Sequence, residues 1–275
     1  IAEQRLDDPE GIAIINPEES PDYTRYVSRY WEVRQRRGVT YEEARRRMRL
    51  RAYFATTMLE QGTADGLVTG LTTGYADAIR PALEVIGTRA GKRAAGVYIV
   101  VTKNDFKFFA DCTVNIEPSA EDLSEIACLA ADFAKRLELD PRVAFLSFSN
   151  FGSTPHPYSD KVRRAVAMTK SRRPDLHVDG EMQADTAVVA EIIESRYPFS
   201  TVKDANVLVF PSLESANIAY KLLARLGKAK AIGPILLGTG APVHVLQTGD
   251  DVNTIVQIAS VAVMDVMGRK EKTLK

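Results

Sequence analysis

The spacing of apolar residues divides the chain into alternating strands and helices from about residue 95 onward. Apolar runs at 95–101, 142–148 and 229–237 have the length and composition of buried strands. The apolar residues of 119–137 recur every three or four positions, which predicts a long helix between two of these runs. Strands that alternate with helices are typical of parallel sheets with helices on their faces. We therefore predict an α/β fold.

The first ninety residues are dominated by helical spacing. Aromatic and apolar residues recur at that spacing over 23–31, after a short predicted strand at 11–17. Arg34 follows Tyr30 by four residues and extends the aromatic stripe. A cation at the inner edge of an aromatic face needs a partner, which is either a structural carboxylate or an anionic ligand.

Arg80 is a second arginine in an unusual setting. Residues 65–70 predict a short buried strand that leads into the loop 71–75. Pro81 is tolerated best in the first turn of a helix, which predicts that Arg80 lies near a helix N-terminus, where the helix dipole does not favour a cation. Either an anionic ligand shared with the helix end or a salt bridge to Asp77 explains such a position.

A glycine-rich stretch near the end of the chain carries the strongest functional signal. Residues 231–255 predict a buried strand, a loop that contains Gly238 and Gly240, and the start of a helix. Strand-to-helix loops hold anionic ligands in α/β proteins, because backbone N–H groups and the helix N-terminus face the loop. We therefore expect an anion-binding site here.

Composition changes this picture little. Lys+Arg and Asp+Glu both number 36, so net charge indicates no class of partner. The arginine-rich segment 45–51 fits a nucleic-acid patch or a solvated helix face, and the neighbouring Glu42 and Glu43 favour the solvated face. No apolar run approaches the roughly 20 residues of a membrane helix, and the cysteines and histidines show no metal-binding spacing. We expect a cytoplasmic protein without metal, nucleic-acid or membrane partners, and a piece of a longer chain because it begins at Ile1.

Several motifs, in order along the chain, resemble one family. The stretch 231–255 keeps the framework glycines, prolines and aliphatic residues of the terminal motif of phosphotransacetylases, which move acetyl groups between phosphate and coenzyme A (CoA). Segments 147–152 and 180–184 are most similar to the phosphotransacetylase-like domain at the C-terminus of bacterial hybrid malic enzymes. Further segments that match the family are 64–70, 79–82, 109–111, 142–149, 179–185, 205–211 and 217–221.

The resemblance implies a two-lobed phosphate acetyltransferase-like α/β fold, with parallel sheets flanked by helices. Residues 1–90 plus 240–275 would form lobe I and residues 91–239 lobe II, with the ligand cleft between them. The family's first strand–helix units have no counterpart in this sequence. Members of the family form homodimers, so we expect a homodimer.

The resemblance also implies a set of ligand-binding residues. Three arginines match family residues that anchor phosphate and CoA, and one lysine matches the residue that faces the nucleotide part of CoA. Other residues would line the cleft from both lobes. The full set expected for acetyl-CoA is Arg34, Thr73, Tyr75, Arg80, Ser149, Asn150, Lys221, Arg225, Gly233, Pro234, Ile235, Thr239, Gln247 and Thr248.

The reactive part of the family's site is replaced. Acetyl transfer needs a group that orients the thiol, a cation that offsets charge on the acyl oxygen and a carboxylate base. The family supplies a Ser-Arg pair and an Asp six residues after the arginine. Here these positions hold Gln247, Thr248 and Thr254, and Thr73 replaces a family histidine. The neighbouring pair Asp250-Asp251 falls in the first turn of a predicted helix, where carboxylates normally cap.

We therefore expect no catalytic residues and an acetyl-CoA-binding regulatory domain that has lost phosphotransacetylase activity. In the hybrid enzymes that it resembles, an upstream NADP-dependent malic enzyme domain with Mg or Mn oxidatively decarboxylates malate to pyruvate, and acetyl-CoA bound to the C-terminal domain inhibits it. Two alternatives stay open. One is an active phosphate acetyltransferase that uses Asp250 or Asp251 as its base, and the other is a dimerisation module that has lost its ligand.

Overall fold

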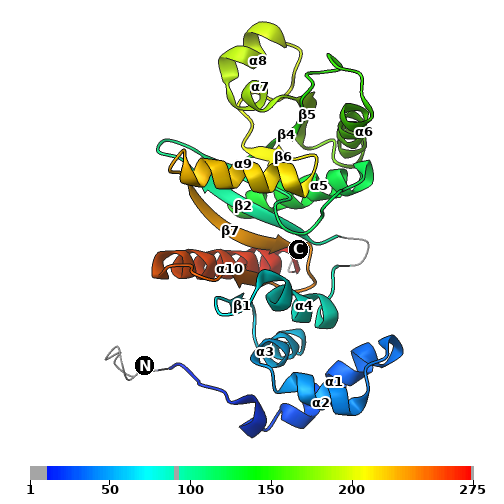
Figure 1. Ribbon diagram of the computed structural model, residues 1–275, viewed down its shortest axis with the longest axis vertical. Helices are drawn as coiled ribbons and strands as arrows, with labels where there is room; N and C mark the ends of the chain where they lie inside the picture. The colour runs from blue at the N-terminus through cyan, green and yellow to red at the C-terminus, as the bar shows by residue number, and fades with distance from the viewer. Residues whose placement is uncertain (1–10, 90–92, 274–275) are drawn as a thin grey trace.

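The computed structural model describes residues 11–89 and 93–273. Figure 1 shows a sheet with flanking helices in the upper part, the helices α1, α2 and α3 in the lower part, and α10 between them. In chain order, the elements are the 3₁₀ turn η2 (Pro17–Glu19), α1 (Tyr23–Arg34), the 3₁₀ turn η3 (Gln35–Arg37), α2 (Tyr41–Met48), α3 (Arg51–Glu60), β1 (Leu67–Gly70), α4 (Tyr75–Val85), β2 (Ala95–Val101), β3 (Phe106–Ala110), α5 (Ala120–Arg136), β4 (Arg142–Leu146), α6 (Pro157–Arg172), β5 (His177–Met182), α7 (Ala184–Val188), α8 (Ala190–Arg196), β6 (Val207–Val209), α9 (Leu213–Arg225), β7 (Lys230–Leu237), β8 (Val243–Leu246) and α10 (Val252–Thr273).

The larger sheet has six strands in the order β5-β4-β6-β3-β2-β7. β5, β4, β6 and β3 are parallel, which confirms the predicted parallel arrangement for this part of the sheet. β2 is antiparallel to both of its neighbours, β3 and β7. The reason is local: the turn at 102–105 joins β2 to β3, and a parallel pair would need a crossover of a dozen or more residues.

Helices cover both faces of this sheet. The core on one face joins α5, α6 and α10 to the strands and includes fully buried Phe108, Phe133 and Phe145. The core on the other face joins α7, α8 and α9 to the strands and includes buried Tyr98 and Tyr220. Three layers of this kind are the stable solution for a mostly parallel sheet, which must bury both faces. The predicted α/β class is thus confirmed.

The smaller sheet pairs β1 with β8 in parallel, from Leu67 opposite Val243 to Gly70 opposite Leu246. Its strands come from distant parts of the sequence, and their carboxyl ends lie at the same edge. The loops that follow them, 71–74 and 247–251, are therefore brought together. Helices α1, α2 and α3 form a separate aromatic core below this sheet. The division of the chain into lobes at residues 90 and 240 stays a prediction.

A buried cluster of charges fixes α10 against the rest of the molecule. The Asp265 carboxylate of α10 is fully buried and lies 3.0 Å from Arg136 of α5 and 2.8 Å from Arg269 of α10. His244 of β8 is also buried, with Nε2 3.7 Å from the same carboxylate. Buried charges are tolerated only with partners, so this cluster locks the relative positions of α5, α10 and β8.

One local prediction is wrong. Residues 11–16 form no strand with any described part of the chain, and Ile12, Ile14 and Ile15 are exposed. Tertiary contacts rather than local composition decide whether such a segment becomes a strand.

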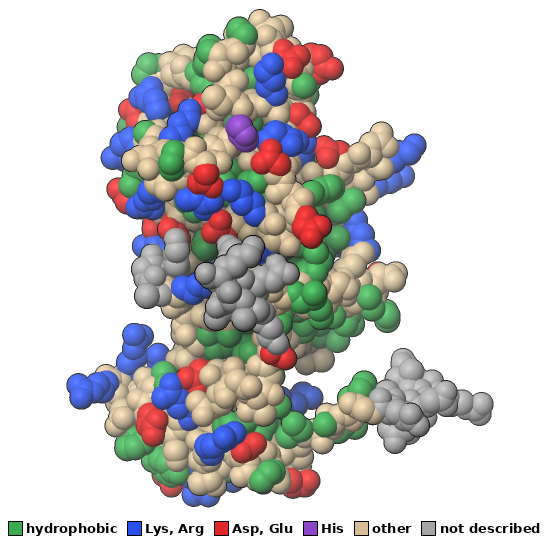
Figure 2. All heavy atoms as spheres, turned by 180° about the vertical axis from the view of Figure 1, so that it is seen from behind, with side chains coloured by type: hydrophobic (Ala, Val, Ile, Leu, Met, Phe, Trp, Pro, Cys, Tyr) green, Lys and Arg blue, Asp and Glu red, His purple; other side chains and the backbone are tan. Residues whose placement is uncertain are grey.

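Surface charge is mixed. On the face drawn in Figure 2, lysines and arginines are interspersed with acidic side chains. Within residues 11–89 and 93–273, no helix is both long and apolar enough to cross a membrane.

Candidate functional site

The loops after β1 and β8 meet at one edge of the small sheet. The Thr248 hydroxyl lies 3.5 Å from the Thr73 carbonyl oxygen, which is a long hydrogen bond, and both residues are exposed. Two of the predicted ligand-binding residues, far apart in the sequence, are thus neighbours. Polar groups at the carboxyl ends of parallel strands occupy the usual place for ligands in α/β folds.

Gln247 connects this edge to the larger sheet. Its side-chain amide donates a hydrogen bond to the Tyr98 hydroxyl of β2, and the Tyr98 ring stacks on Tyr220 of α9 with centroids 4.2 Å apart. Gly233 of β7 makes room for that ring: a Cβ at Gly233 would lie 2.8 Å from a Tyr98 ring carbon, at a φ of +150°. Burial is the main cause that raises the pKa of Tyr98 far above its usual range, and the hydrogen bond with Tyr220 adds to it. The Tyr98 hydroxyl therefore stays protonated. Predicted Pro234 follows Gly233 and is buried in β7.

A second polar group lies at the start of α4. The Tyr75 hydroxyl is 3.2 Å from the Thr113 hydroxyl in the loop after β3. That loop is held by the buried Asp111 carboxylate, which accepts hydrogen bonds from the backbone of Gly96 and of Asn115. Burial raises the pKa of Tyr75 to about 12, so this hydroxyl can donate to a ligand but cannot act as a base near neutral pH. Thr113 was missed from the sequence, because only the fold brings it to Tyr75.

The predicted cations on α9 are free to meet an anion. Lys221 and Arg225 are exposed one turn apart on this helix, directly after the Tyr220 ring that stacks on Tyr98. Among the described residues, neither makes an ion pair. Exposed cations spaced like this suit a phosphorylated ligand that lies along the helix.

Arg80 does not sit where the sequence predicted. Helix α4 continues through Pro81, so Arg80 lies in the middle of the helix and not near its N-terminus. Pro81 lies beyond the first turn, so the helix gives up the backbone hydrogen bond that the Asp77 carbonyl would accept. The Arg80 guanidinium lies 3.3 Å from the Asp77 carboxylate with both side chains largely exposed. This salt bridge was the competing explanation for Arg80.

Arg34 is the last residue of α1. Its Nε atom is buried and has no hydrogen-bond partner among the described residues. Glu84 of α4 supplies a counter-charge. Burial alone would raise the pKa of Glu84, but hydrogen bonds from Tyr30 and Tyr53 and the positive charges of Arg47 and Arg34 lower it overall.

A cavity of about 470 Å³ opens beside Thr73, between α3, β1 and α4; we refer to it as the α3–α4 pocket. Arg51 and Thr72 are part of its wall. The sequence assigned Arg51 to a solvated helix face, and no local signal distinguished it from the other arginines of 45–51. The lining residues are Leu50, Arg51, Ala52, Tyr53, Ala55, Leu67, Val68, Thr69, Gly70, Thr72, Thr73, Asp77 and Pro81.

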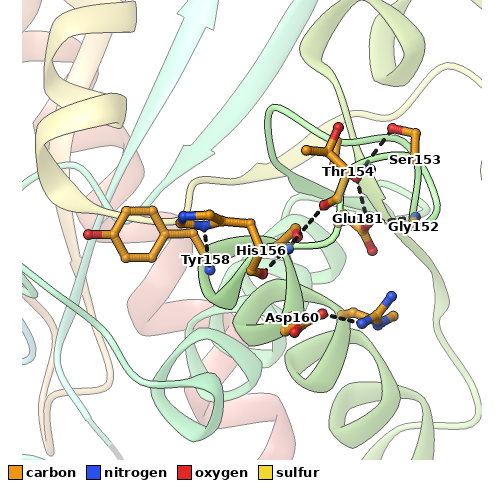
Figure 3. Close-up of polar contacts among 10 residues, drawn as sticks. Gly152, Ser153, Thr154, His156, Tyr158, Asp160 and Glu181 are labelled. Atoms are coloured by element: carbon orange, nitrogen blue, oxygen red, sulfur yellow. Dashed lines mark hydrogen bonds and ion pairs between the residues drawn. The ribbon is translucent and has the colours of Figure 1, made fainter.

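Ser149 and Asn150 are not brought to this place by any described contact. Both lie in the loop after β4, where the Ser149 hydroxyl donates to Glu181 at 3.0 Å and Asn150 exchanges hydrogen bonds with Gln183. Figure 3 shows Gly152, Ser153 and Thr154 of the same loop beside Glu181. β4 is four strand spacings from β7, or about 19 Å.

Ile235 and Thr239 have no exposed surface. Ile235 is part of the core beneath α5, and the Thr239 hydroxyl donates to the Ala241 carbonyl at 2.8 Å. Only their backbone atoms could take part in a ligand site.

The carboxylates near Thr248 are occupied by local hydrogen bonds. Asp250 accepts from the Gln247 backbone N–H at 2.7 Å, and Asp251 accepts from both the backbone N–H and the hydroxyl of Thr254, each at 2.7 Å. Asp251 directly precedes α10 and caps it, as the sequence predicted for a carboxylate there. The hydrogen bonds from Thr254 lower the pKa of Asp251, which makes it a weaker base, and the stretch from Gln247 to Thr254 contains no guanidinium.

The histidines offer no replacement base. His156 caps α6, His177 is exposed at the start of β5, and burial lowers the pKa of His244 to about 4 in the interior. Within the described part of the chain, no group of three or more His, Cys, Asp or Glu side chains is arranged to hold a metal ion.

A mixed six-stranded sheet between helix layers, joined by α10 to a small parallel sheet, defines a two-sheet α/β protein. Residues 1–263 match the family model described as phosphate acetyl/butaryl transferase, so the chain belongs to this family. The solved phosphotransacetylase from Streptococcus pyogenes superimposes with a TM-score of 0.88 at 40% identity, over 94% of this chain and 80% of that one. This likeness confirms the predicted phosphotransacetylase-like fold.

Two named relatives differ in function. The chain is 42% identical over 254 residues to a phosphate acetyltransferase of Thermoanaerobacterium thermosaccharolyticum, covering 89% of this chain and 77% of that protein. It is 38% identical over 256 residues to an NADP-dependent malic enzyme of Escherichia coli, covering 92% of this chain but 34% of that protein. By name, the relatives favour a phosphate acetyltransferase over the regulatory domain expected from the sequence.

Proposed function

We propose that this chain binds acetyl-CoA where the two sheets meet and does not transfer the acetyl group. One observation carries the proposal: the family's arginine and aspartate positions hold the neutral Thr248 and Thr254, while Asp250 and Asp251 each use one oxygen in local hydrogen bonds at the start of α10. Charge that develops on the acyl oxygen therefore meets no cation from position 248, and no carboxylate stands at the position where the family has its base.

The expected loss of rate is large. A missing oxyanion-type donor costs roughly 100- to 1000-fold, and a missing general base costs about 100- to 10,000-fold. Binding needs less, since exposed Lys221 and Arg225 supply positive charge and Tyr75 supplies a hydroxyl donor. The site is thus better suited to hold a CoA thioester than to react with it.

We further propose that the domain regulates a larger protein. The similarity to an NADP-dependent malic enzyme, of which the chain covers 34%, supports a link to a malic enzyme domain. In our proposal that domain lies upstream and would use NADP with Mg or Mn. Acetyl-CoA would inhibit that domain, through closure of the junction or a shift between the subunits of a homodimer. The strength of such coupling cannot exceed the difference in ligand affinity between the two states.

An active phosphate acetyltransferase is the second candidate, and the names of the relatives favour it. It requires that Asp250 or Asp251, which cap the start of α10 through one oxygen each, act as the base from a position other than the family's. Turnover by the unmodified chain near roughly 10 per second, an ordinary enzyme rate, would establish this candidate and contradict the first.

A gain-of-function variant tests the proposal directly. The double substitution Thr248→Arg with Thr254→Asp restores a cation and a carboxylate at the two positions where the family has them. We expect acetyl phosphate formation from acetyl-CoA and phosphate to rise at least tenfold above the wild-type background. The control is Thr248→Gln with Thr254→Asn, which has similar size and no charge. Equal activity of the two double variants would show that charge at these positions is not what the chain lacks.

A further inference from the structure

A second cavity lies at the carboxyl ends of two neighbouring strands of the larger sheet. It measures about 360 Å³, and its lining includes Ser147 and Phe148 after β4, Pro211 and Ser212 after β6, and Lys161 of α6; we refer to it as the Lys161 cavity. Although β4 and β6 are neighbours, the helices that follow them, α6 and α9, pack on opposite faces of the sheet. Loops that diverge in this way leave a crevice where open α/β sheets commonly bind a molecule. None of the lining residues belongs to the set expected for acetyl-CoA.

Lys161 differs from the other lysines whose side chains the structure describes. Within residues 11–89 and 93–269, it is the only lysine that is partly buried and makes no ion pair. The remaining ones either are exposed or pair with a carboxylate, as Lys107, Lys135, Lys170 and Lys203 do. The Lys161 ammonium donates a hydrogen bond to the Pro211 carbonyl oxygen at 2.9 Å, which holds the amine in the wall of the cavity.

The surroundings of Lys161 favour its neutral form. Burial lowers the pKa of the amine, and the negative charge of Glu117, which lines the same cavity, only partly opposes this effect. A lysine amine is a nucleophile only when it is neutral, and burial is one of the ways in which proteins activate it. Lys161 is therefore both positioned and activated for attack on an electrophile in the cavity.

The rest of the lining suits an acyl group. Phe148 and Tyr158 supply aromatic surface, and both rings pack against His156, with centroids 5.7 and 4.9 Å away; Figure 3 shows Tyr158 beside His156. The Ser147 hydroxyl oxygen accepts from the Ser149 backbone N–H at 3.3 Å, but the hydroxyl proton has no acceptor among the described residues. This hydroxyl can donate to an acyl carbonyl oxygen, where negative charge develops during attack.

We propose that Lys161 is a site of covalent acylation by a small activated acyl compound, either an acyl phosphate or an acyl thioester. The neutral amine attacks the acyl carbonyl carbon and an N–C bond forms. The C–O bond to phosphate, or the C–S bond to the thiol, breaks, the leaving group departs with the electron pair, and the surplus amine proton passes to water. In the resulting amide, Lys161 has lost its charge and keeps one N–H for the Pro211 carbonyl. The proposal goes beyond the proposed function, since it needs no acetyl-CoA at the junction of the sheets.

The test measures acetylation of each lysine in the wild-type chain. The chain is incubated at constant pH with acetyl phosphate and, separately, with acetyl-CoA, and mass spectrometry of its peptides gives the rate at Lys161 and at Lys103. Lys103 is exposed, lies in the turn between β2 and β3 and serves as the internal reference. We expect Lys161 to react roughly tenfold faster than Lys103 with at least one donor, as befits a positioned and activated nucleophile.

The outcomes identify the donor or overturn the proposal. A faster reaction with only one of the two compounds shows which class of acyl donor enters the cavity. The preference for Lys161 should disappear in denaturing urea, because it depends on the fold. A rate at Lys161 that is equal to or below the rate at Lys103 with both donors overturns the proposal, and so does a preference that persists in urea.

Two matched variants test the cause of the reactivity. Glu117 and Glu214 both line the cavity, but the charge of Glu117 is the one that raises the pKa of Lys161 against the effect of burial. Glu117→Gln should therefore increase the acetylation rate of Lys161 about twofold or more, and Glu214→Gln should stay close to the wild type. A rate in Glu117→Gln at or below the wild-type rate would show that protonation of the amine does not control the reaction, which contradicts the proposal.

Discussion

The buried His244 makes the protein sensitive to mild acid. Burial is the main cause that lowers the pKa of His244 to about 4; the Asp265 carboxylate opposes this effect, and the charges of Arg269 and Arg136 add to it. In the unfolded chain, a histidine has a pKa of about 6.5. The unfolded state therefore binds more protons than the folded state between these two values, and stability must fall as pH falls through this window.

The size of the effect follows from the two pKa values. The free energy of unfolding would fall by roughly 3 kcal/mol if the histidine were fully protonated in the unfolded state and neutral in the folded state, because each pKa unit corresponds to about 1.4 kcal/mol. Between pH 7 and pH 5, the expected loss is about 2 kcal/mol. The buried Asp265 does not contribute in this window. Burial raises its pKa, the ion pairs with Arg269 and Arg136 outweigh that effect, and the net lowered pKa matters only below about pH 4.

Urea unfolding at pH 7 and at pH 5 measures the free energy of unfolding at each pH. The two values are comparable when the m-value is the same at both pH values. The wild type should lose about 2 kcal/mol between the two pH values. The variant His244→Gln removes the titrating group, so it should lose much less over the same interval, even if it is less stable at pH 7. An equal loss in the wild type and in His244→Gln would refute the assignment of the acid sensitivity to this histidine.

Three further substitutions test the packing that positions the site. Arg136→Met leaves Asp265 with one ion-pair partner fewer in the interior and should lower the free energy of unfolding by about 3 to 5 kcal/mol in the same urea assay. Gly233→Ala places a Cβ 2.8 Å from the Tyr98 ring at a φ of +150°. It should weaken acetyl-CoA binding measured by calorimetry, and unchanged affinity would show that Tyr98 is not part of the acetyl-CoA site. Ser119→Ala removes the capping box of α5 and should lower the melting temperature by the equivalent of about 1 kcal/mol, with acetyl-CoA affinity unchanged.

The periodic part of the fold was predictable from the sequence. Apolar runs located β2, β4 and β7 to within a few residues, and the helical spacing of 119–137 located α5. These elements bury one face or both, so their patterns record the packing directly. The exposed isoleucines of 11–16 resemble a strand in composition, but a strand needs a partner, and the composition of a short segment cannot supply one.

The candidate site was predictable only in part. The 231–255 stretch and the loop 71–75 were identified as ligand loops, but their contact through Thr73 and Thr248 depends on the parallel pairing of β1 with β8. The α3–α4 pocket depends on how α3 packs beside β1, which no local pattern encodes. Arg51 therefore could not be distinguished from the other arginines of 45–51 until the fold showed that it lines this pocket.

The most direct test of the account is calorimetric titration of the wild-type chain with acetyl-CoA, with acetyl phosphate formation measured in the same samples after phosphate is added. The account predicts saturable binding at one site per chain and no turnover above background. Turnover near roughly 10 per second would contradict it in favour of an active phosphate acetyltransferase. Absence of binding at millimolar acetyl-CoA would contradict it in favour of a dimerisation module without a ligand.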